Sequence, residues 1–247
     1  MKHTELGIVP RPRQVTRTDG EGYRVDETTA IGCDAESQPI AGYLADRIQR
    51  STGIALTVRE PESARPGISL AVGSVPEMTS LQGYRLVSSA DGVRITGNSP
   101  AGLFYGVQTF LQLCPPQVYG VAGTTSAPAD WEIPAVEIAD EPYFDNIRGL
   151  HIDVSRHFLD KHEAFQVIDI LAMHKLNTLH IHLTDNQGWR MEIRAFPRLT
   201  EVGAIGCHSA MNEGPARYFT QQDLREIIAY AESRYIRVMP EIDMPGH

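Results

Sequence analysis

Hydrophobic residues in the first hundred positions recur with spacings typical of both helices and strands. In the segment 41–53, AGYLADRIQRSTG, Leu44 and Ile48 lie four residues apart and Gly53 closes the run. This spacing predicts a helix that ends at a glycine C-cap. The next apolar run, GISLAVGS at 67–74, predicts a strand.

Residues 83–99, GYRLVSSADGVRITGNS, form two alternating runs that meet around Asp91 and Gly92. An Asp-Gly pair between two such runs is typical of a β-hairpin. Ser99 then stands where an N-cap is expected, and the proline and apolar face after it predict a helix over 99–114. We therefore expect the amino-terminal part to be an α+β domain, an antiparallel sheet with helices on one face.

Between residues 115 and 142 the chain is rich in proline, glycine, serine and alanine and offers no long periodic segment. We place a domain boundary at its end, which gives one domain over 1–142 and a second over 143–247. The second starts with alternating strands and helices, predicted at 147–155, 161–177, 178–185, 220–235 and 236–243, with Thr220 as a helix cap. Such alternation is typical of an α/β fold in which crossover helices join parallel strands.

Acidic residues and a histidine gather at one end of these three strands. Asp153 closes the first strand, Asp185 closes the second, and Asp243 and His247 follow the third. In parallel α/β folds, above all the (β/α)8 barrel, side chains at the carboxyl ends of the strands line the active site. We expect the active site there, with Glu241 on the same strand face as Asp243 because residues two apart share a face.

The loops after the strands add further candidates. Asp185 stands where its strand opens into a loop, and Trp189 follows as an aromatic ring suited to the flat face of a sugar or another apolar ligand. The turn residues Pro245 and Gly246 are expected to direct His247 back over the strand ends. An acid close to His247 would hold its imidazole in one tautomer and raise its basicity.

His180 and His182 lie two apart on a predicted strand, so they share one face. A barrel metallohydrolase uses such a His-x-His pair as metal ligands, but hydrogen-bonded core histidines fit the same pattern. A metal site of that kind needs more His or Asp ligands from later strands, and the sequence has none that we recognise. We expect no metal and no cofactor, with a metal-dependent barrel hydrolase left as an alternative.

Composition and charge narrow the class further. The 247 residues include 42% hydrophobic and 21% charged residues, which is typical of globular domains with a substantial core. The formal net charge of -9 argues against nucleic acid, because non-specific affinity for its phosphates needs clustered Lys and Arg. Cys33, Cys114 and Cys207 are scattered without metal-like spacing, so we expect free thiols.

The first residues, MKHTELGIVPRPRQV, lack the apolar core of a signal peptide. No run approaches the roughly 18 apolar residues of a membrane span. We therefore expect a soluble, cytoplasmic protein with no membrane partner, although a shortened start would leave export open. The oligomeric state stays open.

Four motifs in the second half resemble a known family. In chain order they are RGLHIDVSRHF, HKLNTLHIHLTDNQGWRMEI, FPRLTEVGA and PEIDMPGH, and their order and spacing are those of the front of the catalytic barrel of glycoside hydrolase family 20, the β-N-acetylhexosaminidases. Upstream, IVPRP and GYRLVSSADGVRITGNSPAGLFYGVQTFLQL are similar to the non-catalytic amino-terminal domain of that family. The resemblance covers nearly the whole chain.

The resemblance implies exo-hydrolysis of terminal β-linked N-acetylglucosamine or N-acetylgalactosamine from an oligosaccharide or small glycoside, with retention. The 2-acetamido group of the sugar then replaces the enzyme nucleophile of most retaining glycosidases. Carried over by position, Asp185 and His247 form a relay that positions an acid/base Glu, and Arg148 holds sugar hydroxyls. Arg148 lies at the start of its strand, whereas barrel geometry favours the far end. Further candidates at the site are Asp153, His182, Trp189, Glu241 and Asp243.

The sequence departs from the family pattern at two places. Asn186 stands where the family often has a second Asp. In the family a catalytic Asp-Glu pair follows the fourth barrel strand, and this sequence is predicted to hold three. We therefore expect a truncated barrel that is inactive by itself, with a non-catalytic carbohydrate-binding protein on the same scaffold as the alternative.

Overall fold

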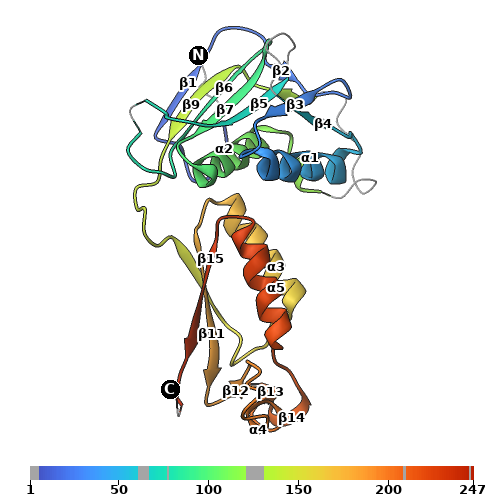
Figure 1. Cartoon of the computed structure of the whole chain (residues 1–247), viewed down its shortest axis with the longest axis vertical. Coiled ribbons are helices and arrows are strands. Elements are labelled where there is room, and N and C mark those ends of the chain that lie inside the picture. The colour runs from blue at the N-terminus through green and yellow to red at the C-terminus, as the bar shows by residue number, and fades with distance from the viewer. Residues whose placement is uncertain (1–5, 61–66, 77, 121–130, 208–209, 245) are drawn as a thin grey trace. The chain divides into compact units, whose positions relative to one another are not determined.

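A computed structural model describes residues 6–60, 67–76, 78–120, 131–207, 210–244 and 246–247. The chain divides into two compact units, residues 1–145 and 146–247. Each unit has its own sheet with helices packed against it (Figure 1). The division falls slightly later than the boundary expected after residue 142.

The first unit is built on a seven-stranded sheet. Its strands, in spatial order, are β1 (Gln14–Arg17), β9 (Val136–Asp140), β6 (Tyr84–Ser89), β7 (Gly92–Gly97), β5 (Ile68–Val72), β3 (Ala30–Cys33) and β4 (Thr57–Arg59). The predicted hairpin is the β6–β7 pair, in which Ser89 lies opposite Gly92. A small separate sheet pairs β2 (Tyr23–Arg24) with β8 (Glu132–Ile133).

The sheet of the first unit is mixed, which corrects the expectation of a purely antiparallel one. Strands β1, β9, β6 and β7 pair antiparallel, whereas β7, β5, β3 and β4 pair parallel. Parallel pairing arises because helix α1 (Gln38–Thr52) connects β3 to β4 as a crossover. β3 and β4 have four and three residues, too few for an alternating pattern to reveal them in the sequence.

Two helices cover one face of this sheet, as expected (Figure 1). Helix α1 ends at Gly53, whose backbone adopts the left-handed φ of 80° that glycine tolerates. Helix α2 (Pro100–Leu113) begins after Ser99, whose side chain accepts a hydrogen bond from the backbone N–H of Gly102. Both helices bury apolar side chains against the sheet, and a short 3-10 helix (Pro116–Tyr119) follows α2.

The second unit contains the predicted alternation of strands and helices. β10 (Gly149–Asp153), β11 (Thr178–Asp185) and β15 (Arg237–Ile242) are parallel, with β11 between the other two. This confirms the fold class, a mixed amino-terminal domain followed by the start of an α/β barrel. The remaining elements are α3 (Lys161–Met173), β12 (Gly188–Trp189), α4 (Arg198–Glu201), β13 (Ile205–Cys207), β14 (Ala210–Ala216) and α5 (Gln221–Glu232).

Helices α3 and α5 begin at capping boxes formed by Asp160 with Glu163 and by Thr220 with Asp223. Helix α3 ends at Met173, earlier than the 177 expected, because Lys175 takes the left-handed backbone conformation with φ of 59°. The two helices contact each other and pack on one side of the strands (Figure 1). Among the described residues, no helix has the length and apolar character required to cross a membrane.

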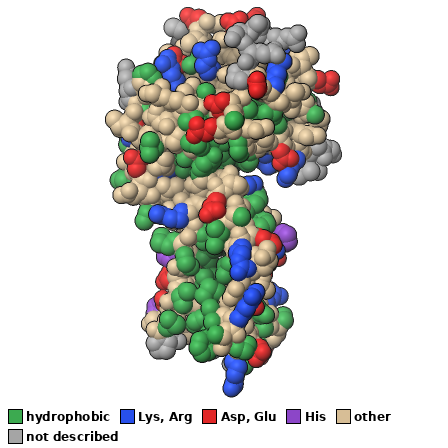
Figure 2. Space-filling model, in the orientation of Figure 1, with side chains coloured by type: hydrophobic (Ala, Val, Ile, Leu, Met, Phe, Trp, Pro, Cys, Tyr) green, Lys and Arg blue, Asp and Glu red, His purple; other side chains and the backbone are tan. Residues whose placement is uncertain are grey.

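The alternation of side chains along β11 decides what each face of the second sheet carries. Leu179, Ile181 and Leu183 are buried on the helix-covered face. His180 and His182 therefore lie on the opposite face, which carries polar groups. Figure 2 also shows hydrophobic side chains along the visible surface of the second unit. Its exposed apolar residues include Leu150, Ile170, Phe196, Val202, Ile228, Ile242 and Met244.

Candidate active site

The strand register brings the predicted polar residues together on the helix-free face. His182 of β11 lies opposite Asp153 of β10 and Glu241 of β15. Asp185 ends β11 and Asp243 directly follows β15. The carboxyl ends of all three parallel strands therefore meet at one place, as barrel geometry requires.

The carboxylate of Asp185 is the centre of this cluster, and its side chain has no exposed surface (0%). Its Oδ2 lies 2.8 Å from Nη2 of Arg156, 2.9 Å from Nε2 of His182 and 2.8 Å from Nδ1 of His247. Its Oδ1 accepts hydrogen bonds from the backbone N–H groups of Asn186 at 2.6 Å and His247 at 3.3 Å. Asp185 is thus an acceptor for every neighbour that it has in this cluster.

Burial by itself would raise the pKa of Asp185. The hydrogen bonds from Asn186, His247 and His182, together with the charge of Arg156, outweigh burial and hold the pKa of this carboxyl well below its ordinary value. Because the carboxylate is an acceptor, Nδ1 of His247 carries the proton. A neutral His247 then presents Nε2 as a base, on a ring whose side chain is 69% exposed.

Arg156 is a component that the sequence analysis missed. Its guanidinium contacts Asp153 at 2.9 Å, Gln187 Oε1 at 2.8 Å and Asp185 at 2.8 Å. Asp153 also accepts a hydrogen bond from the backbone N–H of Arg156, so the loop after β10 is folded around this pair. The sequence feature that could have indicated Arg156 is its position three residues after Asp153, the acid that closes a barrel strand.

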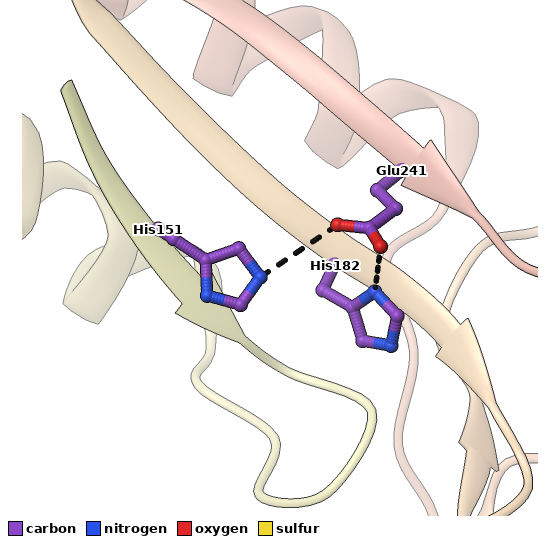
Figure 3. A group of neighbouring side chains, drawn as sticks. All are labelled: His151, His182 and Glu241. Atoms are coloured by element: carbon purple, nitrogen blue, oxygen red, sulfur yellow. Dashed lines mark ion pairs between the residues drawn. The ribbon is translucent and has the colours of Figure 1, made fainter. Parts of the chain in front are cut away.

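A second group surrounds Glu241 on the same sheet face. Its Oε2 lies 2.7 Å from Nε2 of His180 and 3.7 Å from Nε2 of His151. Its Oε1 lies 3.0 Å from Nδ1 of His182, and Figure 3 shows this contact as an ion pair. Burial by itself would lower the pKa of His182, but the hydrogen bond to Asp185 and the charges of Glu241 and Asp153 raise that pKa.

Arg190 was also missed, and it holds the loops around the site. The residue is fully buried, and its guanidinium donates to five carbonyl oxygens, at distances of 2.7 to 3.1 Å. The acceptors belong to Val154, Ser155, Ala204, Gly206 and Arg217. The sequence gives little warning of this role, because arginine is usually a surface residue.

Three other predicted site residues, Trp189, Asp243 and Arg148, make contacts of different kinds. Trp189 lines an open depression of about 750 Å³ together with Asp185, and its indole N–H donates to the carbonyl of Met191. Asp243 Oδ2 lies 3.9 Å from Nδ1 of His247. Arg148 lies just before β10, and its guanidinium donates to the carbonyl of Lys175.

The turn before His247 is only partly described, because Pro245 lies outside the described residues. Gly246 passes very close to Asn186: a Cβ at this position would lie 2.1 Å from Asn186 Oδ1. The atoms in the way belong to the exposed side chain of Asn186, and beyond this turn both the backbone N–H and the imidazole of His247 reach Asp185.

Comparison with known proteins identifies the class to which this fold and site belong. Residues 146–247 match the glycosyl hydrolase family 20 catalytic domain, and residues 5–141 match domain 2 of the same family. The chain therefore belongs to glycosyl hydrolase family 20, as the sequence motifs indicated.

Several relatives are similar over nearly the whole chain. A beta-hexosaminidase of Porphyromonas gingivalis is 41% identical over 98% of this chain and 30% of its own length. The GH20 β-N-acetylhexosaminidase structure from Streptomyces coelicolor superposes with a TM-score of 0.87 and 38% identity, over 99% of this chain and 48% of that one. The Vibrio harveyi exo β-N-acetylglucosaminidase in complex with N-acetylglucosamine gives 0.82 and 29%, over 99% and 37%. The chain thus spans less than half the length of these relatives.

Proposed function

We propose that the chain supplies the amino-terminal domain and the first three barrel strands of a β-N-acetylhexosaminidase. The complete enzyme removes terminal, non-reducing, β-linked N-acetylglucosamine or N-acetylgalactosamine with retention of configuration. The acetamido oxygen of the substrate attacks the anomeric carbon, so the enzyme needs an acid/base carboxyl group and no carboxylate nucleophile. Family membership and the bound N-acetylglucosamine of the Vibrio harveyi relative support this substrate class.

The observation that carries the proposal is the buried Asp185 carboxylate in contact with His247. In the proposed mechanism, Asp185 holds His247 in the tautomer that leaves Nε2 free, and Nε2 receives a hydrogen bond from the acid/base Glu. The pair thereby sets the orientation of that Glu and tunes its pKa as it alternates between acid and base. The resemblance assigns this Glu and its Asp neighbour to the end of a fourth strand, outside residues 1–247.

Two further residues have proposed substrate contacts. Arg148 would hold sugar hydroxyls with its planar guanidinium, which can donate two parallel hydrogen bonds. Trp189 would offer an apolar ring beside the sugar, and the open depression that it shares with Asp185 leaves room for such a contact.

The test uses a protein that carries this chain together with the rest of the catalytic domain. Asp185→Asn and His247→Ala should each lower kcat by roughly 10- to 1000-fold, and the double variant should be little worse than the poorer single variant. Non-additivity is expected because the two residues act as one unit. The readout is release of the aryl alcohol from an aryl β-N-acetylglucosaminide.

The control is His162→Ala, at the exposed start of α3, which should leave kcat unchanged. Strictly multiplicative losses would contradict a joint role of Asp185 and His247. Binding of N-acetylglucosamine by the longer protein with no turnover at all would instead favour the non-catalytic carbohydrate-binding alternative.

A further inference from the structure

Helices α1 and α2 cover one face of the first sheet and leave the other face open (Figure 1). Tyr84 of β6 and Ile95 of β7 lie against Gly106 of α2, so the residues next to them in each strand point to the open face. This face contains a groove of about 460 Å³, whose lining includes Ser74, Arg85, Val87, Arg94, Thr96 and Glu137. We propose that the groove binds one carboxylate-bearing sugar unit. The site lies in the first unit and does not depend on the proposed hydrolysis.

Arg94 is an exposed cation of this groove. Strand register places Val87 between Arg94 and Glu137, because Val87 lies opposite both residues. The backbones of Arg94 and Glu137 are therefore two strand spacings apart, roughly 10 Å. Glu137 instead pairs with Arg85 of the adjacent strand, at 2.5 Å. Within the described ranges of the chain, no residue forms a hydrogen bond or an ion pair with Arg94.

The charge of the groove selects a monoanion. The two arginines and Glu137 leave one unbalanced positive charge, on a protein whose formal net charge is -9. A carboxylate carries one negative charge, and its two oxygens match the two-donor edge of a guanidinium. A phosphate ester carries roughly -1.5 to -2 at pH 7, and its excess charge would lie close to Glu137. Arg94 is therefore suited to a carboxylate.

The other groups of the groove fit the hydroxyls and the ring of a sugar. Thr96 lies opposite Arg85, and Ser74 is exposed, so each presents a hydroxyl that can donate and accept. Glu137 accepts and Arg85 donates, so their ion pair offers both kinds of partner side by side to neighbouring sugar hydroxyls. Val87 supplies an apolar contact for the ring. The volume lies within the range of about 300–1,000 Å³ that is usual for small-ligand sites.

The test is an NMR titration of residues 1–247 with a matched pair of probes. Methyl glucuronide and methyl glucoside differ only in a carboxylate that replaces a hydroxymethyl group. We expect the glucuronide to bind at least about 10-fold more tightly, because the glucoside lacks the charge-assisted hydrogen bonds to Arg94. The backbone amide signals of Val87 and Arg94 should shift, and that of Asp185 should not. Shifts confined to the surroundings of Asp185 would overturn the proposal.

Three further probes test the assignment of the ligand. Glucose 6-phosphate and glucose 6-sulfate keep the sugar ring and change the anionic group, and N-acetyl-aspartate amide represents an acidic peptide. Each should bind more weakly than methyl glucuronide. Binding of any of them as tight as that of the glucuronide would overturn the assignment to a carboxylate-bearing sugar.

Two variants and one matched control locate the contacts, after circular dichroism has shown that each is folded like the parent. Arg94→Gln should weaken glucuronide binding at least about 10-fold, and Thr96→Val should weaken it about 2- to 10-fold, the contribution of one neutral hydrogen bond. Arg50→Gln, at an arginine of α1 whose side chain is 72% exposed, should change nothing. Parental affinity in Arg94→Gln, or no glucuronide binding by the folded parent, would contradict the proposal.

Discussion

Replacing Arg190 by methionine tests whether one buried guanidinium holds the loops of the second unit together. Methionine keeps most of the apolar volume of the side chain but removes all five hydrogen bonds to backbone carbonyls. These carbonyls belong to the loop after β10, which carries Arg156, and to the segments around β13 and β14. Burial lowers the pKa of Arg190, yet an arginine remains charged, so each bond is charge-assisted.

The expected cost follows from the acceptors that are left behind. A hydrogen bond to a charged group contributes about 1.5–3 kcal/mol, and a buried polar group without a partner costs about 1–3 kcal/mol. Contributions within one network do not add, and water can reach some of the carbonyls. If only two of the five stay unpaired, the loss is about 2–6 kcal/mol, so we expect about 4 kcal/mol. This is a large share of the roughly 5–15 kcal/mol that stabilises a typical domain.

The assay separates the two units by their tryptophans, Trp131 in the first unit and Trp189 in the second. In a Trp131→Phe background, urea unfolding followed by fluorescence reports the second unit alone. Arg194→Met is the matched control, because Arg194 is 68% exposed and its nearest acid, Glu192, is 3.8 Å away. A loss below about 1 kcal/mol for Arg190→Met, no larger than that of the control, would refute this account.

Four further outcomes are expected. Gly246→Ala would place its Cβ 2.1 Å from the side-chain oxygen of Asn186, so this side chain must turn away and its amide NMR signals should shift; unchanged Asn186 signals would contradict the close approach. Arg148→Lys in the longer protein should weaken N-acetylglucosamine binding, and equal affinity would remove Arg148 from the site. The pKa of Asp185 is lowered on folding, so the ionised carboxylate stabilises the folded protein at every pH above its ordinary pKa of 3.8. This contribution is lost as pH falls through the lower pKa of the folded state. The difference in Tm between the parent and Asp185→Asn should therefore narrow only in strong acid. Residues 1–247 by themselves should not hydrolyse an aryl β-N-acetylglucosaminide, and turnover abolished by His247→Ala would contradict this.

Local sequence signals located most elements of the second unit. The predicted strand over 178–185 has the bounds of β11, and Thr220 caps α5 as expected. These predictions succeed because side-chain alternation and helix capping depend on neighbours within a few residues. The early end of α3 was missed because the left-handed conformation of Lys175 has no signature in a lysine.

Sequence reasoning failed where the structure depends on residues distant along the chain. The parallel half of the first sheet was missed because β3 and β4 carry too few residues to show a period. Arg156 and Arg190 were missed for another reason: their partners are carboxylates and carbonyls that only the folded chain brings together. Because arginine is usually a surface residue, nothing local marks Arg190 as one that will be buried.

The strand register decides which side chains meet at the site. The face on which the β11 histidines lie was predictable from the sequence, whereas their neighbours on β10 and β15 were not. The period of two places His180 and His182 on the face that the helices leave open, and parallel pairing then sets His182 between Asp153 and Glu241. Three acids on so small a face, Asp153, Asp185 and Glu241, would repel one another unless cations separated them. Arg156 and His182 occupy the positions between the acids. Strand pairing therefore places positive and negative side chains alternately across the site. A slip of one residue in β11 would send both histidines to the apolar side and leave the acids unseparated, which is why the register of this strand controls the chemistry of the face.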